Sequence, residues 1–166
     1  MTTSRFERLL PLAGILAGIC FAAGFPLHHL PGTPNETGAV GVVHDHATGN
    51  ALAGITAALA GAALLYFVVA IRAALRSGEA GESAYSGAAY AGGIVLAGVL
   101  GLEACLLFSM VDAAAKGDAA SVAAIGWLEA DLWVFWSMAA TVTAMAATSC
   151  MAAAPGVFAI APVFKR

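Results

Sequence analysis

Residues 51–71 read ALAGITAALAGAALLYFVVAI and contain no charged side chain. The hydrocarbon core of a bilayer is ~30 Å thick, so a helix that crosses it needs roughly 20 predominantly apolar residues. This segment meets that requirement. Backbone groups inside lipid must be hydrogen-bonded within the protein itself, which favours a helix over other conformations. The segment therefore predicts a membrane-spanning helix.

The rest of the chain shares this apolar character. Of its 166 residues, 61% are hydrophobic and only 10% are charged, whereas soluble domains usually carry about 25% charged residues. Three further segments are apolar enough to span a bilayer, at residues 9–27, 87–111 and 127–153. We therefore predict an all-α integral membrane bundle of four transmembrane helices. It forms one domain over residues 1–166, with a long outer loop at residues 28–50.

The basic residues predict the orientation of this bundle. Of the seven Lys and Arg residues, all except Lys116 fall on one side of a four-span chain: Arg5, Arg8, Arg72, Arg76, Lys165 and Arg166. Cytoplasmic segments carry an excess of Lys and Arg, so both termini are expected in the cytoplasm and the protein in the plasma membrane. Trp127, Trp133 and Trp136 lie at the outer end of the fourth segment, where interfacial aromatic residues are common.

The first apolar segment also fits a signal peptide. Arg5 and Arg8 form a short basic region, and an apolar region follows. Loss of this segment would leave an odd number of spans around cytoplasmic Arg72 and Arg76. We therefore expect it to remain as a membrane span.

Small residues four positions apart predict where the helices approach one another, because close backbone contact drives helix association in lipid. The predicted stripes are Gly14 with Gly18, Gly54 with Ala58 and Ala62, Ala140 with Ala144, and Gly93 with Ala97, Gly101 and Cys105. A chain rich in Ala and Gly also produces such spacings by chance. The stripes therefore indicate a tight bundle and not a specific dimer.

All four histidines, His28, His29, His44 and His46, lie in the outer loop. Imidazole is the commonest metal ligand, and a carboxylate such as that of Asp45 can complete a zinc-type site. Alternation along an extended segment would place His44 and His46 on the same side. The histidines are thus candidate ligands for zinc or copper, and no other cofactor is implied. The alternative is that they gather in a loop because histidine is disfavoured in lipid.

Glu103 is a charged residue within an apolar segment. It lies about nine residues, or ~13 Å, inside the outer boundary of the third span. An ionised carboxylate there costs several kcal/mol unless it is paired, protonated or near water. Helical periodicity places Glu103 opposite the stripe of Ala97, Gly101 and Cys105. We therefore expect it to meet a second helix, another subunit or lipid, with a role in proton or cation handling or in a structural hydrogen bond.

Two more acidic residues, Glu129 and Asp131, lie beside the tryptophans of the fourth segment. Solvation at the membrane interface is sufficient to explain them. They could join the histidines as ligands only if the outer loop folds over the fourth helix.

The sequence contains no nucleophile elbow, phosphate loop, HExxH or CxxCH motif, so an enzyme is not expected. No run of basic residues suggests nucleic acid binding. The leading interpretation is a non-enzymatic accessory or scaffold membrane subunit, which pairs in the lipid bilayer with a partner protein or with copies of itself. The alternative is a metal-ion or proton-linked transporter or sensor that uses the outer-loop histidines and Glu103.

The order of features resembles an uncharacterised family of bacterial, often actinobacterial, multi-pass membrane proteins. The residues that carry the resemblance are Leu12-Ala13-Gly14-Ile15, His46-Ala47-Thr48-Gly49-Asn50 and Trp127-Leu128-Glu129-Ala130-Asp131-Leu132. Members of that family usually continue beyond a fourth span, so a naturally short or a truncated version is expected here. The family has no established activity, so the resemblance implies a multi-pass fold and no function.

Overall fold

The computed structural model describes residues 5–30, 38–78 and 85–153, and all regular secondary structure in these ranges is helical. The predicted all-α class is therefore confirmed for the described part of the chain. The elements are α1 (Arg5–Gly24), the 3-10 helix η1 (Phe25–Leu27), α2 (Ala39–Asp45), α3 (Ala47–Gly78), α4 (Tyr85–Ala115) and α5 (Ala119–Ala153).

Two helices in the described residues are long and apolar enough to cross a membrane, namely Ala47–Ala73 within α3 and Tyr85–Ala115, which is α4. Leu12–Leu27 forms a shorter apolar helix. Only 33% of the most apolar window in each long helix is buried inside the protein. Length and composition therefore indicate a membrane association through α3 and α4.

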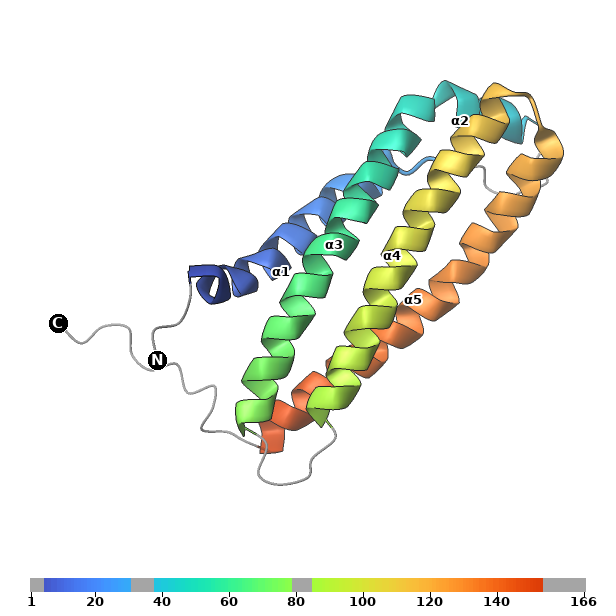
Figure 1. The fold of residues 1–166 in the computed structure, drawn as a ribbon. Coiled ribbons are helices and arrows are strands. Elements are labelled where there is room, and N and C mark those ends of the chain that lie inside the picture. The colour runs from blue at the N-terminus through green and yellow to red at the C-terminus, as the bar shows by residue number, and fades with distance from the viewer. Residues whose placement is uncertain (1–4, 31–37, 79–84, 154–166) are drawn as a thin grey trace.

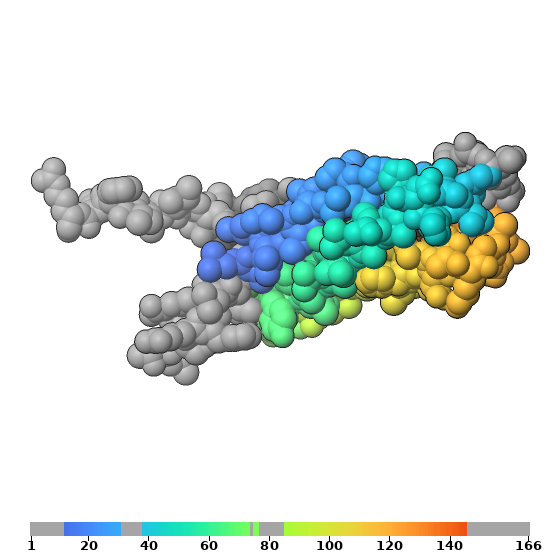
Figure 2. Space-filling view, turned by 90° about the horizontal axis from the view of Figure 1, so that it is seen from above, coloured from blue at the N-terminus to red at the C-terminus, as the bar shows by residue number. Residues whose placement is uncertain are grey.

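The four long helices follow the order α1, α3, α4, α5 across the molecule, and each packs against the next (Figure 1). The helices α3, α4 and α5 run side by side, whereas α1 crosses α3 at an angle. In the space-filling view, α1 lies along one flank of α3, and α4 and α5 lie toward the other (Figure 2). In the described residues, α1 and α5 approach each other through side chains and not through their backbones. This arrangement leaves room between α1 and α5.

One end of the molecule is closed by α2. Gly38, with φ of 93°, precedes this helix, and the side chain of Val43 is completely buried against Met110 of α4 and Val122 of α5. On the same end, Gly117 adopts φ of 70° in the turn between α4 and α5. We call this the α2 end of the molecule (Figure 1).

The predicted outer loop at residues 28–50 is therefore partly helical, because α2 and the first residues of α3 fall within it. The expectation that His44 and His46 alternate on an extended segment is wrong. His44 belongs to α2, and His46 follows the last residue of that helix. The physical reason is the apolar face of α2, which becomes buried only when residues 39–45 form a helix across α4 and α5.

The rows of small residues at which the helices meet coincide only in part with the predicted stripes. Gly54 and Gly93 closely approach the neighbouring helix, and Ala97 is buried. Gly61 of α3 approaches α4 so closely that an added Cβ would lie 3.0 Å from the carbonyl oxygen of Ala97. By contrast, a Cβ at Gly18 or Gly101 would meet no atom within 4 Å. Other members of the predicted stripes that are exposed are Ala58, Ala62, Cys105 and Ala144. A spacing of four alone identified only part of the contact rows, because α4 packs against α3 on one side and α5 on the other.

Candidate functional site

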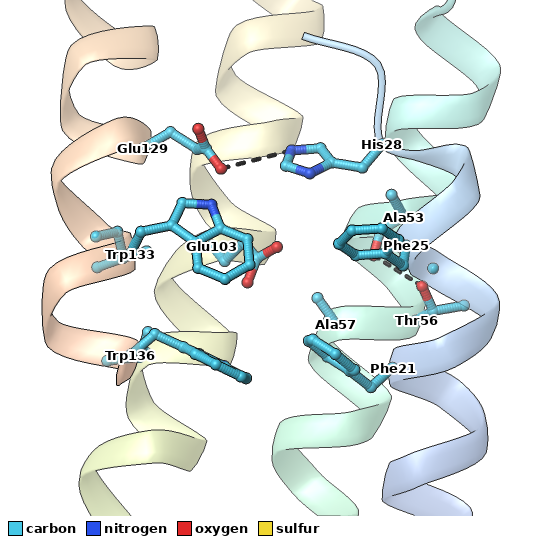
Figure 3. Close-up of a pocket in the computed structure, with 13 residues that line it drawn as sticks. Phe21, Phe25, His28, Ala53, Thr56, Ala57, Glu103, Glu129, Trp133 and Trp136 are labelled. Atoms are coloured by element: carbon cyan, nitrogen blue, oxygen red, sulfur yellow. Dashed lines mark hydrogen bonds and ion pairs between the residues drawn. The ribbon is translucent and has the colours of Figure 1, made fainter. Parts of the chain in front are cut away.

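A cleft lies between α1 and α5, toward the α2 end (Figure 3). Its empty volume is about 560 Å³, counting the part that opens to the outside. The helices α3 and α4 form its floor, and α1 with η1 and α5 form its two walls. The lining residues are Phe21, Gly24, Phe25, His28, Ala53, Thr56, Ala57, Val99, Glu103, Glu129, Leu132, Trp133 and Trp136.

Aromatic rings connect the two walls. Phe21 of α1 stacks on Trp136 of α5 with ring centroids 5.7 Å apart and an interplanar angle of 12°. Trp133 meets Trp136 edge to face at 5.4 Å (Figure 3). Pairs of this geometry are worth about 0.5–1.5 kcal/mol beyond the burial of their area. The rings therefore hold α1 against α5 across the cleft and give it an apolar boundary.

His28 and Glu129 face each other from opposite walls (Figure 3). His28 Nε2 lies 3.6 Å from Glu129 Oε1, and the two side chains are only 17% and 8% exposed. This separation is too long for a hydrogen bond, and the buried Nε2 atom has no hydrogen-bond partner among the described residues. Burial, and to a smaller extent the charge of His29, lower the pKa of His28. This shift favours the neutral form of the His28 ring, and the contact becomes an ion pair only if the ring takes up a proton.

Glu103 adds a second carboxyl group to the cleft. It projects from α4 into the space between the two walls, below the level of Glu129 (Figure 3). The two carboxyl groups are close enough to interact electrostatically. None of the described residues that line the cleft is a Lys or an Arg. The polar atoms there are therefore mostly hydrogen-bond acceptors, which is a costly arrangement in an apolar setting unless a donor or a positive charge joins them.

The backbone beside His28 is held by Asn50, which is only 1% exposed near the start of α3. The His29 backbone N–H donates to Asn50 Oδ1 at 2.8 Å, and Asn50 Nδ2 donates to the His29 carbonyl oxygen at 2.9 Å. The His29 ring also stacks on the His46 ring, with centroids 4.6 Å apart. These contacts join the segment after η1 to α3, and they place His28 over the cleft.

Comparisons of the chain with protein-family models, with curated proteins and with solved structures find no match.

The structure separates the four histidines into three settings. His28 faces Glu129, and His29 stacks on His46. His44 lies on the exposed side of α2, where its Nδ1 atom is 3.8 Å from Asp45 Oδ1. Among the residues whose side chains the structure describes, no group of three or more His, Cys, Asp or Glu is arranged to hold a metal ion. The four histidines therefore do not form one shared site there.

Glu129 could join the histidines only if the outer loop folded over the fourth predicted span. The segment that carries His28 does reach across to α5, where His28 meets Glu129. Asp131, by contrast, is exposed and lies outside the cleft. We expected Glu103 to meet a second helix, another subunit or lipid. In the structure it lines a cleft that has α5 as one wall. Sequence reasoning missed Asn50. The only signal for it was an amide directly before a long apolar run.

Proposed function

We propose that the protein is a four-span plasma-membrane protein, with both termini in the cytoplasm, that binds a cation in its outer cleft. It would act as a sensor or transporter subunit without catalytic activity. The observation that carries the proposal is the convergence of Glu103, Glu129 and the unpartnered Nε2 atom of His28 in an apolar cleft between α1 and α5.

Exposed apolar side chains on every long helix support membrane insertion. The large apolar side chains that are half exposed or more include Ile15 and Ile19 on α1, Leu59 and Tyr66 on α3, Leu102 on α4, and Phe135 and Met138 on α5. Soluble proteins rarely leave continuous apolar surfaces of this extent in water.

The distribution of described charges agrees with the proposed orientation. Arg72 and Arg76 lie in the last turns of α3, far from α2, and Lys116 lies at the α2 end.

The chemistry of the cleft supports a cation as the ligand. A carboxylate within a membrane helix is costly, and such residues commonly mark pathways for ions or protons. Here two carboxyl groups and a neutral imidazole face one space, and no basic side chain from the described residues lines it. A proton or a positively charged ligand would offset the repulsion between Glu103 and Glu129 and supply the missing hydrogen-bond donor.

Cysteine labelling on intact cells tests the proposed topology. In a background with the native cysteines replaced by serine, Lys116→Cys should react with a membrane-impermeant maleimide added outside. Ser83→Cys, in the connection between α3 and α4, should react only after the cells are permeabilised. Labelling of both positions in intact cells would overturn the four-span orientation.

Tryptophan fluorescence tests cation binding, because Trp133 and Trp136 line the cleft. The emission of the purified wild-type protein in detergent should respond to pH and to a panel of inorganic and organic cations. The response should be lost when Glu103→Gln and Glu129→Gln are combined. The Asp131→Asn variant removes one carboxylate from the same helix outside the cleft, so it should respond as the wild type does. A double variant with an unchanged response would contradict the proposal.

The scaffold interpretation, in which the protein pairs with a partner or with further copies, stays a prediction from the sequence. A monodisperse monomer in several mild detergents and in lipid nanodiscs would count against it.

A further inference from the structure

We propose that the cation is a primary organic ammonium group on a short apolar body, with the ammonium between Glu103, Glu129 and His28 and the body along the aromatic wall. This inference rests on the proposed function and names its ligand class. The ammonium could belong to a free amine or to an ethanolamine lipid headgroup, because both present the same R–NH₃⁺ chemistry.

The arrangement of acceptors favours an organic cation over a metal ion. Glu103, Glu129 and His28 line one cleft, yet the described residues contain no group of three ligating side chains within reach of a single metal ion. An ammonium group with three N–H donors and an attached carbon chain spans a wider set of acceptors than a bare ion at ~2 Å bond lengths.

The aromatic wall supplies the second part of the recognition. Phe25 and Trp133 flank the space occupied by the Glu103 carboxyl group, and Phe21 and Trp136 close it on the side away from His28 (Figure 3). Aromatic faces attract ammonium groups, and most strongly when water is excluded. The remaining lining of the cleft is mainly apolar, which suits an alkyl or aryl body better than a hydrated metal ion.

His28 indicates that the ammonium carries N–H groups. With its proton on Nδ1, the neutral ring presents a lone pair at Nε2, which is buried and has no partner among the described residues. Thr56 cannot fill this gap, because its hydroxyl already donates to the Ala53 carbonyl oxygen at 2.9 Å. A primary ammonium carries three N–H donors, which is enough for Nε2 and one oxygen of each carboxylate. A quaternary ammonium has no hydrogen to donate and would leave Nε2 unpartnered.

Three ligands of matched shape separate these contributions on the wild-type protein. Hexylammonium has the charge and the donors, 1-hexanol lacks the charge, and hexyltrimethylammonium lacks the donors. Binding is measured in phosphatidylcholine nanodiscs by tryptophan fluorescence, to which Trp133 and Trp136 of the cleft contribute, with isothermal titration calorimetry as a second readout. We expect saturable binding of hexylammonium that is roughly tenfold or more tighter than binding of either analogue. Equal binding of 1-hexanol, or of hexyltrimethylammonium, would overturn the inference.

Variants then assign the site. Glu129→Gln and Glu103→Gln keep the side-chain shape, and each should weaken hexylammonium binding roughly tenfold to a hundredfold. Asp131→Asn should leave the affinity unchanged. Affinity that is equally strong in all three variants would overturn the assignment. Nanodiscs made with phosphatidylethanolamine distinguish the two sources of the ammonium. If hexylammonium binds more weakly in these nanodiscs, the natural ammonium belongs to a lipid headgroup. If it binds equally well, the natural ammonium belongs to a free amine.

The outcome also separates this inference from the proposed function. If zinc or protons change the fluorescence in a manner that needs Glu103 and Glu129, but hexylammonium does not bind, the organic ligand is refuted and cation binding stands. If no cation produces a response that depends on these carboxyl groups, both proposals are refuted.

Discussion

Replacing Gly61 by alanine adds one methyl group where α3 packs closely against the backbone of α4. An ideal Cβ at this position lies 3.0 Å from the carbonyl oxygen of Ala97 and 3.3 Å from Leu100 Cβ. Both neighbours are parts of α4 that cannot rotate away. The two helices must therefore separate slightly to accept the methyl group.

The expected size of the effect follows from two opposing contributions. Alanine is favoured over glycine within a helix by about 1 kcal/mol, whereas an extra methyl group in a well-packed interface typically costs about 1–3 kcal/mol. The Gly61→Ala variant should therefore lose about 1 kcal/mol of stability. Gly101→Ala provides the matched control, because a Cβ there meets no atom within 4 Å and only the gain of up to about 1 kcal/mol remains.

Reversible unfolding of the helical protein in mixed detergent–SDS micelles, followed by far-UV circular dichroism, measures both variants against the wild type. Gly61→Ala should unfold at a lower SDS fraction, and Gly101→Ala at an equal or higher one. The small-residue stripe predicted from the sequence contains Gly101 and not Gly61. It therefore predicts that Gly101→Ala is the less stable of the two variants. A Gly101→Ala variant that is less stable than Gly61→Ala would refute the packing of α3 on α4 described above.

Three further perturbations test the structure around the cleft. Because burial lowers the pKa of His28 from its ordinary value of about 6.5, the folded protein binds fewer protons here than the unfolded chain. The contribution of neutral His28 to the free energy of unfolding is thus fully present above about pH 6.5. It is lost as the pH falls toward the pKa that His28 has in the folded protein. The melting temperature in detergent should drop over this range in the wild type and less in His28→Gln, and equal drops would contradict this account. Asn50→Leu removes both hydrogen bonds to the His29 backbone and should cost about 1–3 kcal/mol in the same melting assay, whereas an unchanged melting temperature would show that the contacts are not needed. Phe21→Ala removes the ring stacked on Trp136 and should shift the tryptophan emission to the red as water enters, while Phe21→Leu, which keeps the wall apolar, should shift it less.

Local composition was sufficient to predict the helical class and to single out Glu103 of the cleft. The apolar run at residues 51–71 required no knowledge of its neighbours, because a long uncharged segment satisfies its backbone as a helix within itself. Glu103 was identified in the same way, since a carboxylate in such a run is costly wherever the helix lies. The boundaries were less accurate. The helix predicted at residues 51–71 is α3 and begins at Ala47, because its first residues pack beneath the segment that carries His29.

The rotation of each helix about its axis and the meeting of His28 with Glu129 were decided only by the tertiary structure. Glycine and alanine occur on several faces of α3 and α4, so the sequence contained more than one plausible contact row, and the approach of Gly61 to Ala97 selected one of them. His28 and Glu129 belong to opposite walls, and they meet because Asn50 fixes the backbone beside His28 while α3 and α4 set the distance between α1 and α5. Hydropathy and helical periodicity describe one segment at a time. A site formed by side chains from four segments depends on the relative positions of helices, and that information exists only once they have packed.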